Sequence, residues 1–370
     1  MTDTASSPAS VASPPGRAIP LDTLRRFCAT LLQAAGLDPA TADLVADSLS
    51  DAEARGIGSH GVQRTRIYVQ RLRAGLLDAT AVPRIVKETP SSVLLDARNA
   101  IGHVGARAGI DLAIARAETG AVCAVGVRNS NHCGTLAFYL RRATERSLVA
   151  LAMSNAPPTM AYHGGRTRAV GTNPLAIGIP SDGGPPLILD MATSATARGK
   201  IILADQLAQP IPPGWAVDVE GRPTTDTQAA LRGAVLPFAG PKGSGLAMMI
   251  ELLCGGLMAG VTGALVGDMY DDWSRPQQVS HLFIAIDPDS FLGRTKFLAH
   301  VKLFTEQVHG LPAAEGFTRV SVPGEIEDAA RSVSEQEGVM ISETVIQDLQ
   351  ALAGELGVAG LPMSSTLPPR

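Results

Sequence analysis

The spacing of apolar residues changes near residue 92, and this change constrains the fold of the 370-residue chain more than any other feature. Before it, apolar residues recur every three or four positions, which predicts three helices between residues 20 and 75. After it, short β-branched runs are separated by Gly, Pro and Asn, which is typical of strands. The predicted strands cover residues 92–96, 121–128, 148–155, 174–180, 186–190 and 281–287.

Helical patterns return between and after these strands. They cover residues 103–118, 135–146, 298–309, 325–332 and 342–355. Because regular β-α-β alternation is not sustained, we predict an α+β fold in which the two ends of the chain pack together. The expected parts are a disordered extension (1–17), a helical lobe (18–90 with 298–362), a sheet lobe (91–297) and a flexible tail (363–370).

Charge and cysteine content exclude several classes of protein. The net charge is -4 with no basic run, so no nucleic-acid partner is expected. The first residues lack the apolar core of a signal peptide. No C-x-x-C pair occurs, which argues against a disulfide framework and for a reducing cytoplasm. The four cysteines are Cys28, Cys123, Cys133 and Cys254.

Residues 243–267 form an apolar run whose one charged residue is Glu251. Its length would suit a membrane span, and a membrane-associated protein would need detergent to stay in solution. A buried helix followed by a Gly-rich turn is the preferred interpretation. A carboxylate within hydrocarbon is costly, and the flanks carry neither basic loops nor aromatic belts.

The segment from Gly56 to Gly61 matches G-x-G-x-x-G, but it follows a helical pattern instead of a strand. We therefore reject a Rossmann dinucleotide loop. The same segment places His60 and Arg64 four residues apart, on one face of a predicted helix. A guanidinium can clamp a substrate carboxylate while an imidazole beside it supplies a proton. The alternative is that Ser59 only caps the helix and Arg64 is solvated.

Two further polar residues follow apolar strands. His132 lies in a turn-forming cluster, where a plain loop histidine is an equal alternative. Asp190 could orient a histidine and raise its pKa, or it could bind turn amides. His132 and Cys133 are adjacent with no second ligand pair, so no metal site is expected.

Two Gly-rich loops, at residues 171–174 and 240–245, could approach a ligand closely or form simple tight turns. The second loop contains Lys242 and precedes an apolar helix. Its backbone amides could hold a pyrophosphate at the helix N-terminus.

Together these segments resemble one family. The ordered set SHGVQR, RNSNHCG, GTNPLAIGIP, LDMATS, LPFAGPKGSGLAMMIELL and VPGE is similar to the malate/L-lactate dehydrogenases of the non-Rossmann type. That family includes ureidoglycolate, sulfolactate and diketogulonate dehydrogenases and piperideine-2-carboxylate reductase. The resemblance covers about residues 21–358, and the combination of motifs is specific where each motif alone is not.

The resemblance implies a family-specific fold with a largely antiparallel sheet that binds NAD or NADP, a helical lobe from both chain ends, and a homodimer. It implies hydride transfer between NAD(P)H and a small 2-oxo or 2-imino acid, or the reverse from a 2-hydroxy acid such as malate, lactate or sulfolactate. A non-catalytic dinucleotide-binding relative is the alternative.

The resemblance also assigns roles to residues. His60 would be the proton donor with Ser59 and Asp190 as its charge-relay partners, Arg64 would bind the substrate carboxylate, and His132 would act in acid–base chemistry. The expected dinucleotide contacts are Leu187, Ile188, Leu189, Asp190, Met191, Ala192, Thr193, Pro241, Lys242, Gly324 and Glu325. Pro241 and Cys133 stand where many members carry an aromatic residue.

Overall fold

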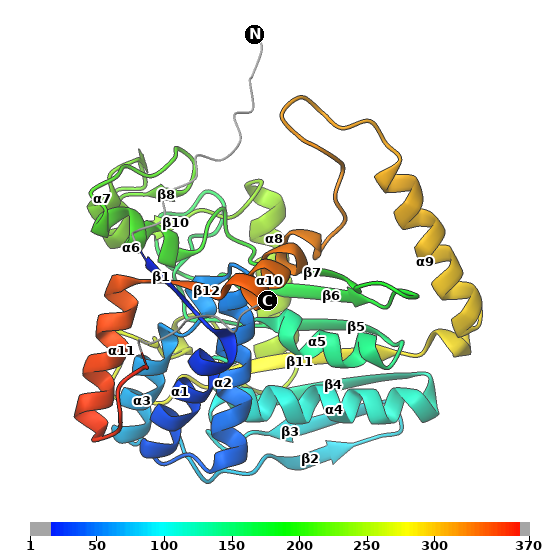
Figure 1. Cartoon of the computed structure of the whole chain (residues 1–370), viewed down its shortest axis with the longest axis horizontal. Coiled ribbons are helices and arrows are strands. Elements are labelled where there is room, and N and C mark those ends of the chain that lie inside the picture. The colour runs from blue at the N-terminus through cyan, green and yellow to red at the C-terminus, as the bar shows by residue number, and fades with distance from the viewer. Residues whose placement is uncertain (1–15, 363–370) are drawn as a thin grey trace.

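The computed structural model describes residues 16–362 and is built around a seven-stranded sheet (Figure 1). Every neighbouring pair in this sheet is antiparallel except β3–β4. This confirms the predicted α+β class with a largely antiparallel sheet. The spatial order is β2 (Arg84–Glu88), β3 (Ser92–Asp96), β4 (Val122–Ser130), β11 (Val279–Ile286), β5 (Val149–Ser154), β6 (Leu175–Ile179) and β7 (Leu187–Met191).

Helices α4 (Gly102–Gly120) and α5 (Leu136–Glu145) cover one face of the sheet (Figure 1). Phe283 of β11 is fully buried beneath them, and a Cβ added at Gly109 would lie 2.8 Å from its ring. Glycine at this position therefore allows the close approach of helix and sheet. The sequence did not predict β2, because all five residues of this edge strand are exposed and carry no apolar alternation.

The helical lobe joins both ends of the described chain. Its core is formed by α1 (Leu21–Ala34), α2 (Pro39–Ala54), α3 (Arg64–Arg73) and α11 (Glu343–Leu356). An antiparallel pair of strands, β1 (Gly16–Ile19) and β12 (Val339–Ser342), lies beside them. The packing of the two ends is confirmed. Gly16 and Arg17 were expected to be disordered but pair with β12, whereas residues 1–15 and the predicted tail lie outside the described residues.

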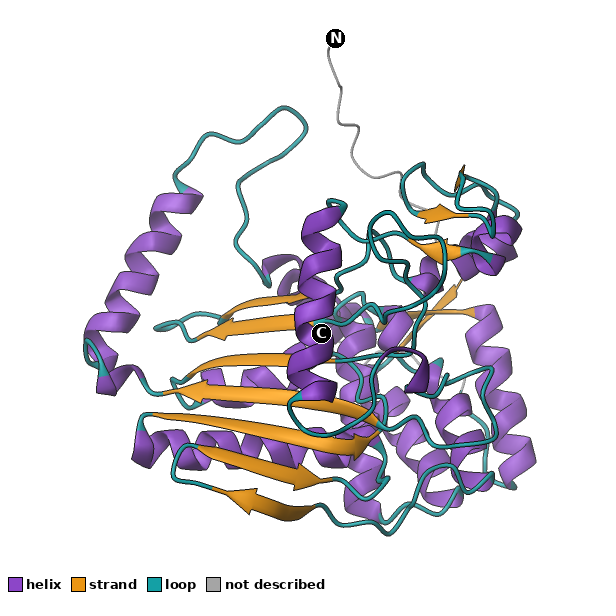
Figure 2. Ribbon diagram, turned by 180° about the vertical axis from the view of Figure 1, so that it is seen from behind, coloured by secondary structure: helices purple, strands orange, loops and turns teal. Residues whose placement is uncertain are grey.

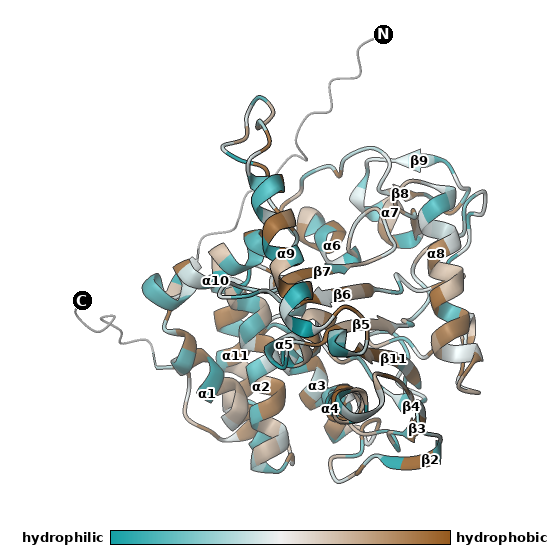
Figure 3. Cartoon of the chain, turned by 90° about the vertical axis from the view of Figure 1, so that its right-hand side faces the viewer, coloured by the Kyte–Doolittle hydropathy of each residue, from teal (hydrophilic) through white to brown (hydrophobic). Residues whose placement is uncertain are grey.

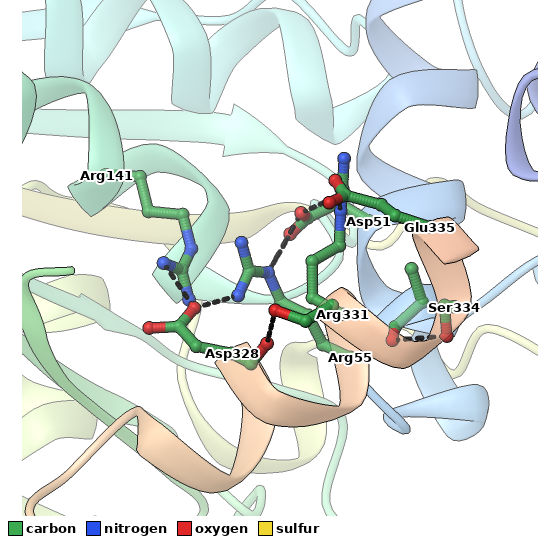
Figure 4. A network of polar contacts seen from close by, with 9 residues as sticks. Asp51, Arg55, Arg141, Asp328, Arg331, Ser334 and Glu335 are labelled. Atoms are coloured by element: carbon green, nitrogen blue, oxygen red, sulfur yellow. Dashed lines mark hydrogen bonds and ion pairs between the residues drawn. The ribbon is translucent and has the colours of Figure 1, made fainter. Parts of the chain in front are cut away.

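A network of charged side chains fastens α10 (Glu325–Glu337) to α2 and α5 (Figure 4). Asp328 binds both Arg55 and Arg141, and the second of these contacts is 3.2 Å long. Asp51 binds Arg55 at 2.9 Å and Arg331 at 2.8 Å. Each carboxylate is thus shared between two guanidiniums, which fixes α10 beside the sheet edge formed by β7.

Two parts of the chain lie outside the lobe and the main sheet. A small unit combines α6 (Arg198–Gln206), α7 (Thr227–Arg232), β8 (Ala216–Val217), β9 (Pro223–Thr224) and β10 (Ala234–Val235). Helix α9 (Arg294–His309) stands away from the body in Figures 1 and 2 and has no buried residue. Its helical state was predicted, but its place in the helical lobe stays a prediction.

The apolar run at 243–267 forms α8 (Pro241–Glu251) and a π-helical turn, Leu252–Gly256, on the face of the sheet opposite α4 (Figure 2). The expectation of a buried helix holds for one face of α8 only. Ile250 and Cys254 face the sheet, but Met249 and Leu252 are 50% and 53% exposed, because no segment within residues 16–362 covers them. Within residues 16–362 no helix is long and apolar enough to cross a membrane.

Candidate active site

A cavity of about 400 Å³ lies where the helical lobe meets the ends of the central strands. Its walls bring together residues from separate predicted motifs, since Ser59, His60, Arg64, His132 and Asp190 all line it. The sequence predicted each of these side chains as a candidate site residue.

The turn that carries His60 is not the helix that the sequence predicted. Gly58–His60 form a single 3₁₀ turn, and α3 begins only at Arg64. The i, i+4 argument was therefore wrong in its geometry, although both side chains still reach the cavity. Gly56, with φ +77°, follows the end of α2 and starts this change of direction.

Glu53 explains the glycines of this turn. Its carboxylate accepts a hydrogen bond of 2.8 Å from the backbone N–H of Val62. A Cβ added at Gly61 would lie 1.7 Å from one carboxylate oxygen, and one at Gly58 would lie 3.0 Å from the other. Two glycines of the G-x-G-x-x-G match, Gly58 and Gly61, therefore make room for the carboxylate of Glu53. Burial raises the pKa of Glu53 to about 7.

His60 lies between a hydroxyl and a second imidazole. Its Nδ1 is 3.0 Å from Ser59 Oγ, and its ring stacks on that of His132 with centroids 5.4 Å apart. Burial, followed by the nearby Arg64 charge, lowers the pKa of His60 to about 3. The ring is therefore neutral at physiological pH, whereas a raised pKa was expected from the sequence.

Arg64 is the first residue of α3, and its guanidinium is held by Ser59 and Tyr270. Its Nε donates to the carbonyl oxygen of Ser59 at 2.7 Å, and its Nη1 donates to the hydroxyl of Tyr270. The guanidinium lies over the Tyr270 ring, 5.4 Å from its centroid. Among residues 16–362, Nη2 has no hydrogen-bond partner, so this edge of the guanidinium is available to an acid in the cavity.

His132 lies two residues after the end of β4 and is more than a loop histidine. Its Nδ1 lies 2.7 Å from the hydroxyl of Tyr68, and its backbone N–H donates to Gln277 at 3.1 Å. Burial, then the charges of Arg64 and the neighbouring histidines, hold the pKa of His132 well below its usual range.

Asp190 closes the cavity on the side of β7. Its carboxylate accepts a 2.8 Å hydrogen bond from the N–H of Ala137 in the first turn of α5. Binding to backbone amides was one of its two interpretations. Within the described residues no hydrogen bond joins Asp190 to His60 or Ser59, so its relay role stays a prediction. Burial raises the pKa of Asp190 to about 6.

The three segments expected to contact a dinucleotide meet at β7. The N–H of Ile188 donates to Pro323, the residue before Gly324, at 3.0 Å. The carbonyl of Thr193 accepts from Phe238, three residues before Pro241, at 3.1 Å. Residues 187–193, Pro241-Lys242 and Gly324-Glu325 therefore share one edge of the sheet.

This edge is compatible with a dinucleotide. The hydroxyl of Thr193 is buried without a hydrogen-bond partner within residues 16–362. The backbone amides at the N-terminus of α8, which were expected to hold a pyrophosphate, instead donate to the carbonyl oxygens of Ala239, Phe238 and Gly240.

Sequence reasoning missed several residues in or beside the cavity. Tyr68 contacts His132 but does not line the cavity, and its position four residues after Arg64 could have suggested a place on the same face of α3. Tyr270 lies in a loop that gave no signal. Arg198 and Lys200, at the start of α6, also line the cavity.

An arginine with an unpaired guanidinium edge, two stacked imidazoles and a dinucleotide-compatible sheet edge are compatible with a nicotinamide-dependent dehydrogenase site. Comparison with known proteins agrees with this class. The malate/L-lactate dehydrogenase family matches residues 19–350, so the chain belongs to this family.

Two relatives and one solved structure illustrate the likeness. A (2R)-3-sulfolactate dehydrogenase (NADP(+)) from Chromohalobacter salexigens is 35% identical over 91% of this chain and 98% of its own. A Delta(1)-pyrroline-2-carboxylate/Delta(1)-piperideine-2-carboxylate reductase from Pseudomonas aeruginosa is 36% identical over 90% and 98%. The structure of sulfolactate dehydrogenase from Methanocaldococcus jannaschii superposes with a TM-score of 0.86 at 33% identity, covering 92% and 98%.

These findings confirm the family that the sequence motifs indicated. The chain is an NAD(P)-dependent oxidoreductase of the type that transfers hydride to or from small hydroxy or imino acids.

Proposed function

We propose that this cavity reduces a small 2-oxo acid, or oxidises the matching 2-hydroxy acid, with Arg64 binding the carboxylate and His60 exchanging the proton. The observation that carries the proposal is the grouping of Arg64 with the stacked rings of His60 and His132 in one cavity. A 2-imino acid presents the same carboxylate and the same reacting carbon.

The charges of the site favour binding of the substrate carboxylate before transfer of the proton. Burial, and then the charge of Arg64, lower the pKa of His60. A bound carboxylate neutralises that charge, so the pKa of His60 rises when substrate binds. Ser59 holds His60 at Nδ1, which leaves Nε2 for the substrate oxygen. Asp190 lies in the same cavity and favours a protonated imidazole once its own carboxyl is ionised. A bound nicotinamide supplies or accepts the hydride.

The preferred substrate carries a second anionic group. Arg198 and Lys200 line the cavity beyond Arg64, and within residues 16–362 neither forms an ion pair. Gly199 between them packs against the catalytic turn, because a Cβ added there would lie 3.6 Å from that of Ser59. Two basic side chains near the reacting carbon suit a sulfonate or a second carboxylate.

We further propose that NAD or NADP binds along β7, with Pro241-Lys242 and Gly324-Glu325 contacting it. The unpaired hydroxyl of Thr193 and the meeting of these segments at β7 support this assignment. Four free, buried cysteines, Cys28, Cys123, Cys133 and Cys254, suit a reducing cytoplasm.

We also propose a homodimer, in which a second copy covers the apolar faces of α8 and α9 (Figure 3). Leu303 and Phe304 on α9 are 53% and 61% exposed, and Met249 and Leu252 on the α8 side are similarly exposed. Exposed apolar side chains on two long helices are typical of an interface between subunits. Sedimentation should give twice the mass of one chain.

The proposal is tested by mixing the purified protein with NADH or NADPH and each of pyruvate, oxaloacetate, sulfopyruvate and piperideine-2-carboxylate. We expect cofactor oxidation with one nucleotide and faster turnover of sulfopyruvate or oxaloacetate than of pyruvate. A preference for pyruvate would contradict the role of Arg198 and Lys200. Cofactor binding without turnover of any acid would favour a non-catalytic protein.

A further inference from the structure

We propose that Tyr68 is a positioning residue that fixes His132 as a neutral hydrogen-bond donor, with its proton on Nε2. The inference rests on the proposed function, because His132 lines the same cavity as His60 and Arg64. It separates the work of the two imidazoles: His132 polarises the substrate oxygen, and His60 exchanges the proton.

The first observation is the short contact between Tyr68 and His132. The Tyr68 hydroxyl lies 2.7 Å from His132 Nδ1, and Tyr68 is 2% exposed. Burial raises the pKa of Tyr68 above its usual value, so the phenol keeps its proton. A protonated phenol beside a ring nitrogen with a free lone pair donates to it.

The second observation removes the ambiguity of a hydroxyl, which can both donate and accept. The backbone N–H of Gly134 also donates to His132 Nδ1, at 3.4 Å. A backbone N–H can only donate, so a proton on Nδ1 would face another donor hydrogen. The neutral ring therefore carries its proton on Nε2.

The third observation concerns the opposite edge of the ring. Nε2 of His132 has no hydrogen-bond partner within residues 16–362 and is not among their unpaired atoms that are sealed from solvent. Since His132 lines the cavity, this N–H can donate to a ligand there. A second proton on the ring is disfavoured, because it would place Nδ1–H against the N–H of Gly134.

His60 has no such restriction. Its Nδ1 faces the hydroxyl of Ser59 at 3.0 Å, which can accept from Nδ1–H in both the neutral and the protonated ring. His60 can therefore gain and lose a proton at Nε2 without leaving its partner.

The Tyr68 ring is itself fixed from behind. It packs edge to face on His103, with centroids 5.5 Å apart and planes at 82°. His103 is fully buried. A phenylalanine at position 68 would keep this packing and remove only the hydroxyl.

The test compares Tyr68→Phe with Tyr139→Phe. Tyr139 is a matched control, because it is also fully buried and its hydroxyl donates to the backbone carbonyl of Cys133, beside His132 but not to its ring. ¹⁵N NMR of the histidine rings, assigned with His132→Gln, reports which nitrogen carries the proton. Steady-state kinetics report kcat and KM separately.

In the wild type we expect the His132 proton on Nε2. Tyr68→Phe should shift the ring toward a mixture of tautomers and lower kcat about tenfold, the scale of one hydrogen bond, with KM nearly unchanged. Tyr139→Phe should leave the tautomer and kcat close to wild type. A wild-type proton on Nδ1 would overturn the proposal, as would an unchanged tautomer in Tyr68→Phe.

Two variations keep the test decisive. If Tyr68→Phe does not fold, fluorotyrosine at position 68, whose hydroxyl is more acidic, should move the Nδ1 resonance of His132; an unmoved resonance overturns the proposal. If the wild type turns over no acid, the proposed function fails, while the NMR measurement still decides the tautomer.

Discussion

The two histidines of the cavity are supplied by two different kinds of backbone. His60 lies on a 3₁₀ turn whose neighbours can change their protonation or hydrogen-bond direction, namely Ser59 and Glu53. His132 follows a central strand, and its partners are a buried phenol and a backbone N–H. A group that exchanges protons needs adaptable partners, whereas a group that polarises a bond needs fixed ones.

The same contrast extends to the segments that hold each histidine. The turn at residues 58–62 is supported by the carboxylate of Glu53, whose raised pKa costs folding free energy at neutral pH. The segment after β4 is held by neutral groups, including the Gln277 side chain on the backbone of His132. Stability near His60 should therefore depend on pH through its supporting carboxylate.

The largest effect is expected from His60→Ala. Loss of the adaptable histidine should lower kcat by about 10²–10⁴-fold, the usual contribution of general acid–base catalysis, while the fold survives. Kinetics together with circular dichroism would check this. If activity persisted in a folded variant, the proton would have to come from elsewhere, and His132 would be the first alternative.

A smaller loss is expected from Arg64→Lys, which keeps the charge but cannot form the bidentate fork with a carboxylate. We expect kcat/KM to fall about 10–100-fold, mainly through KM, as charged hydrogen bonds are lost. Arg73→Lys, at an exposed position on the same helix, is the control. An equal effect in both variants would remove Arg64 from substrate binding.

Glu53→Gln tests the supporting carboxylate. The folded pKa of about 7 lies above the ordinary value of 4.5, so its contribution to stability is complete below pH 4.5 and is lost as pH rises through 7. Glutamine does not titrate and can still accept from Val62. Relative to wild type, the variant should therefore gain about 2–3 kcal/mol of unfolding free energy between pH 4.5 and pH 8.

Urea unfolding at both pH values would measure this difference. Glu337→Gln, at an exposed position, is the matched control and should show no such gain. A difference between wild type and Glu53→Gln that does not change with pH would contradict the assigned titration.

The smallest effect is expected from Asp190→Asn. The amide oxygen can still accept from Ala137, so the variant isolates the charge. Because burial raises the pKa of Asp190 to about 6, we expect kcat/KM to fall about tenfold and an ionisation near pH 6 to disappear from its pH profile. Asp182→Asn, on the exposed loop before β7, is the control. An unchanged pH profile would mean that Asp190 only accepts hydrogen bonds from the backbone of α5.

The amino-acid sequence by itself determined the class of fold and the list of candidate residues. Apolar spacing predicted most helices and six of the seven strands of the main sheet, because periodicity is a local property of the chain. It did not predict β2, because this strand is defined by its pairing with β3 and all its residues are exposed. It also did not predict the exposed face of α8. The motifs named His60, Arg64, His132 and Asp190, because turn residues after apolar segments are visible without a structure.

Only the tertiary structure decided how these residues work together. It placed His60 on a 3₁₀ turn instead of a helix, because Glu53 fills the space beside Gly58 and Gly61. It brought Tyr68 to the ring of His132 across 64 positions of sequence. Hydrogen bonds and pKa shifts depend on neighbours that are distant in the chain, so no local pattern encodes which imidazole is free to change its charge.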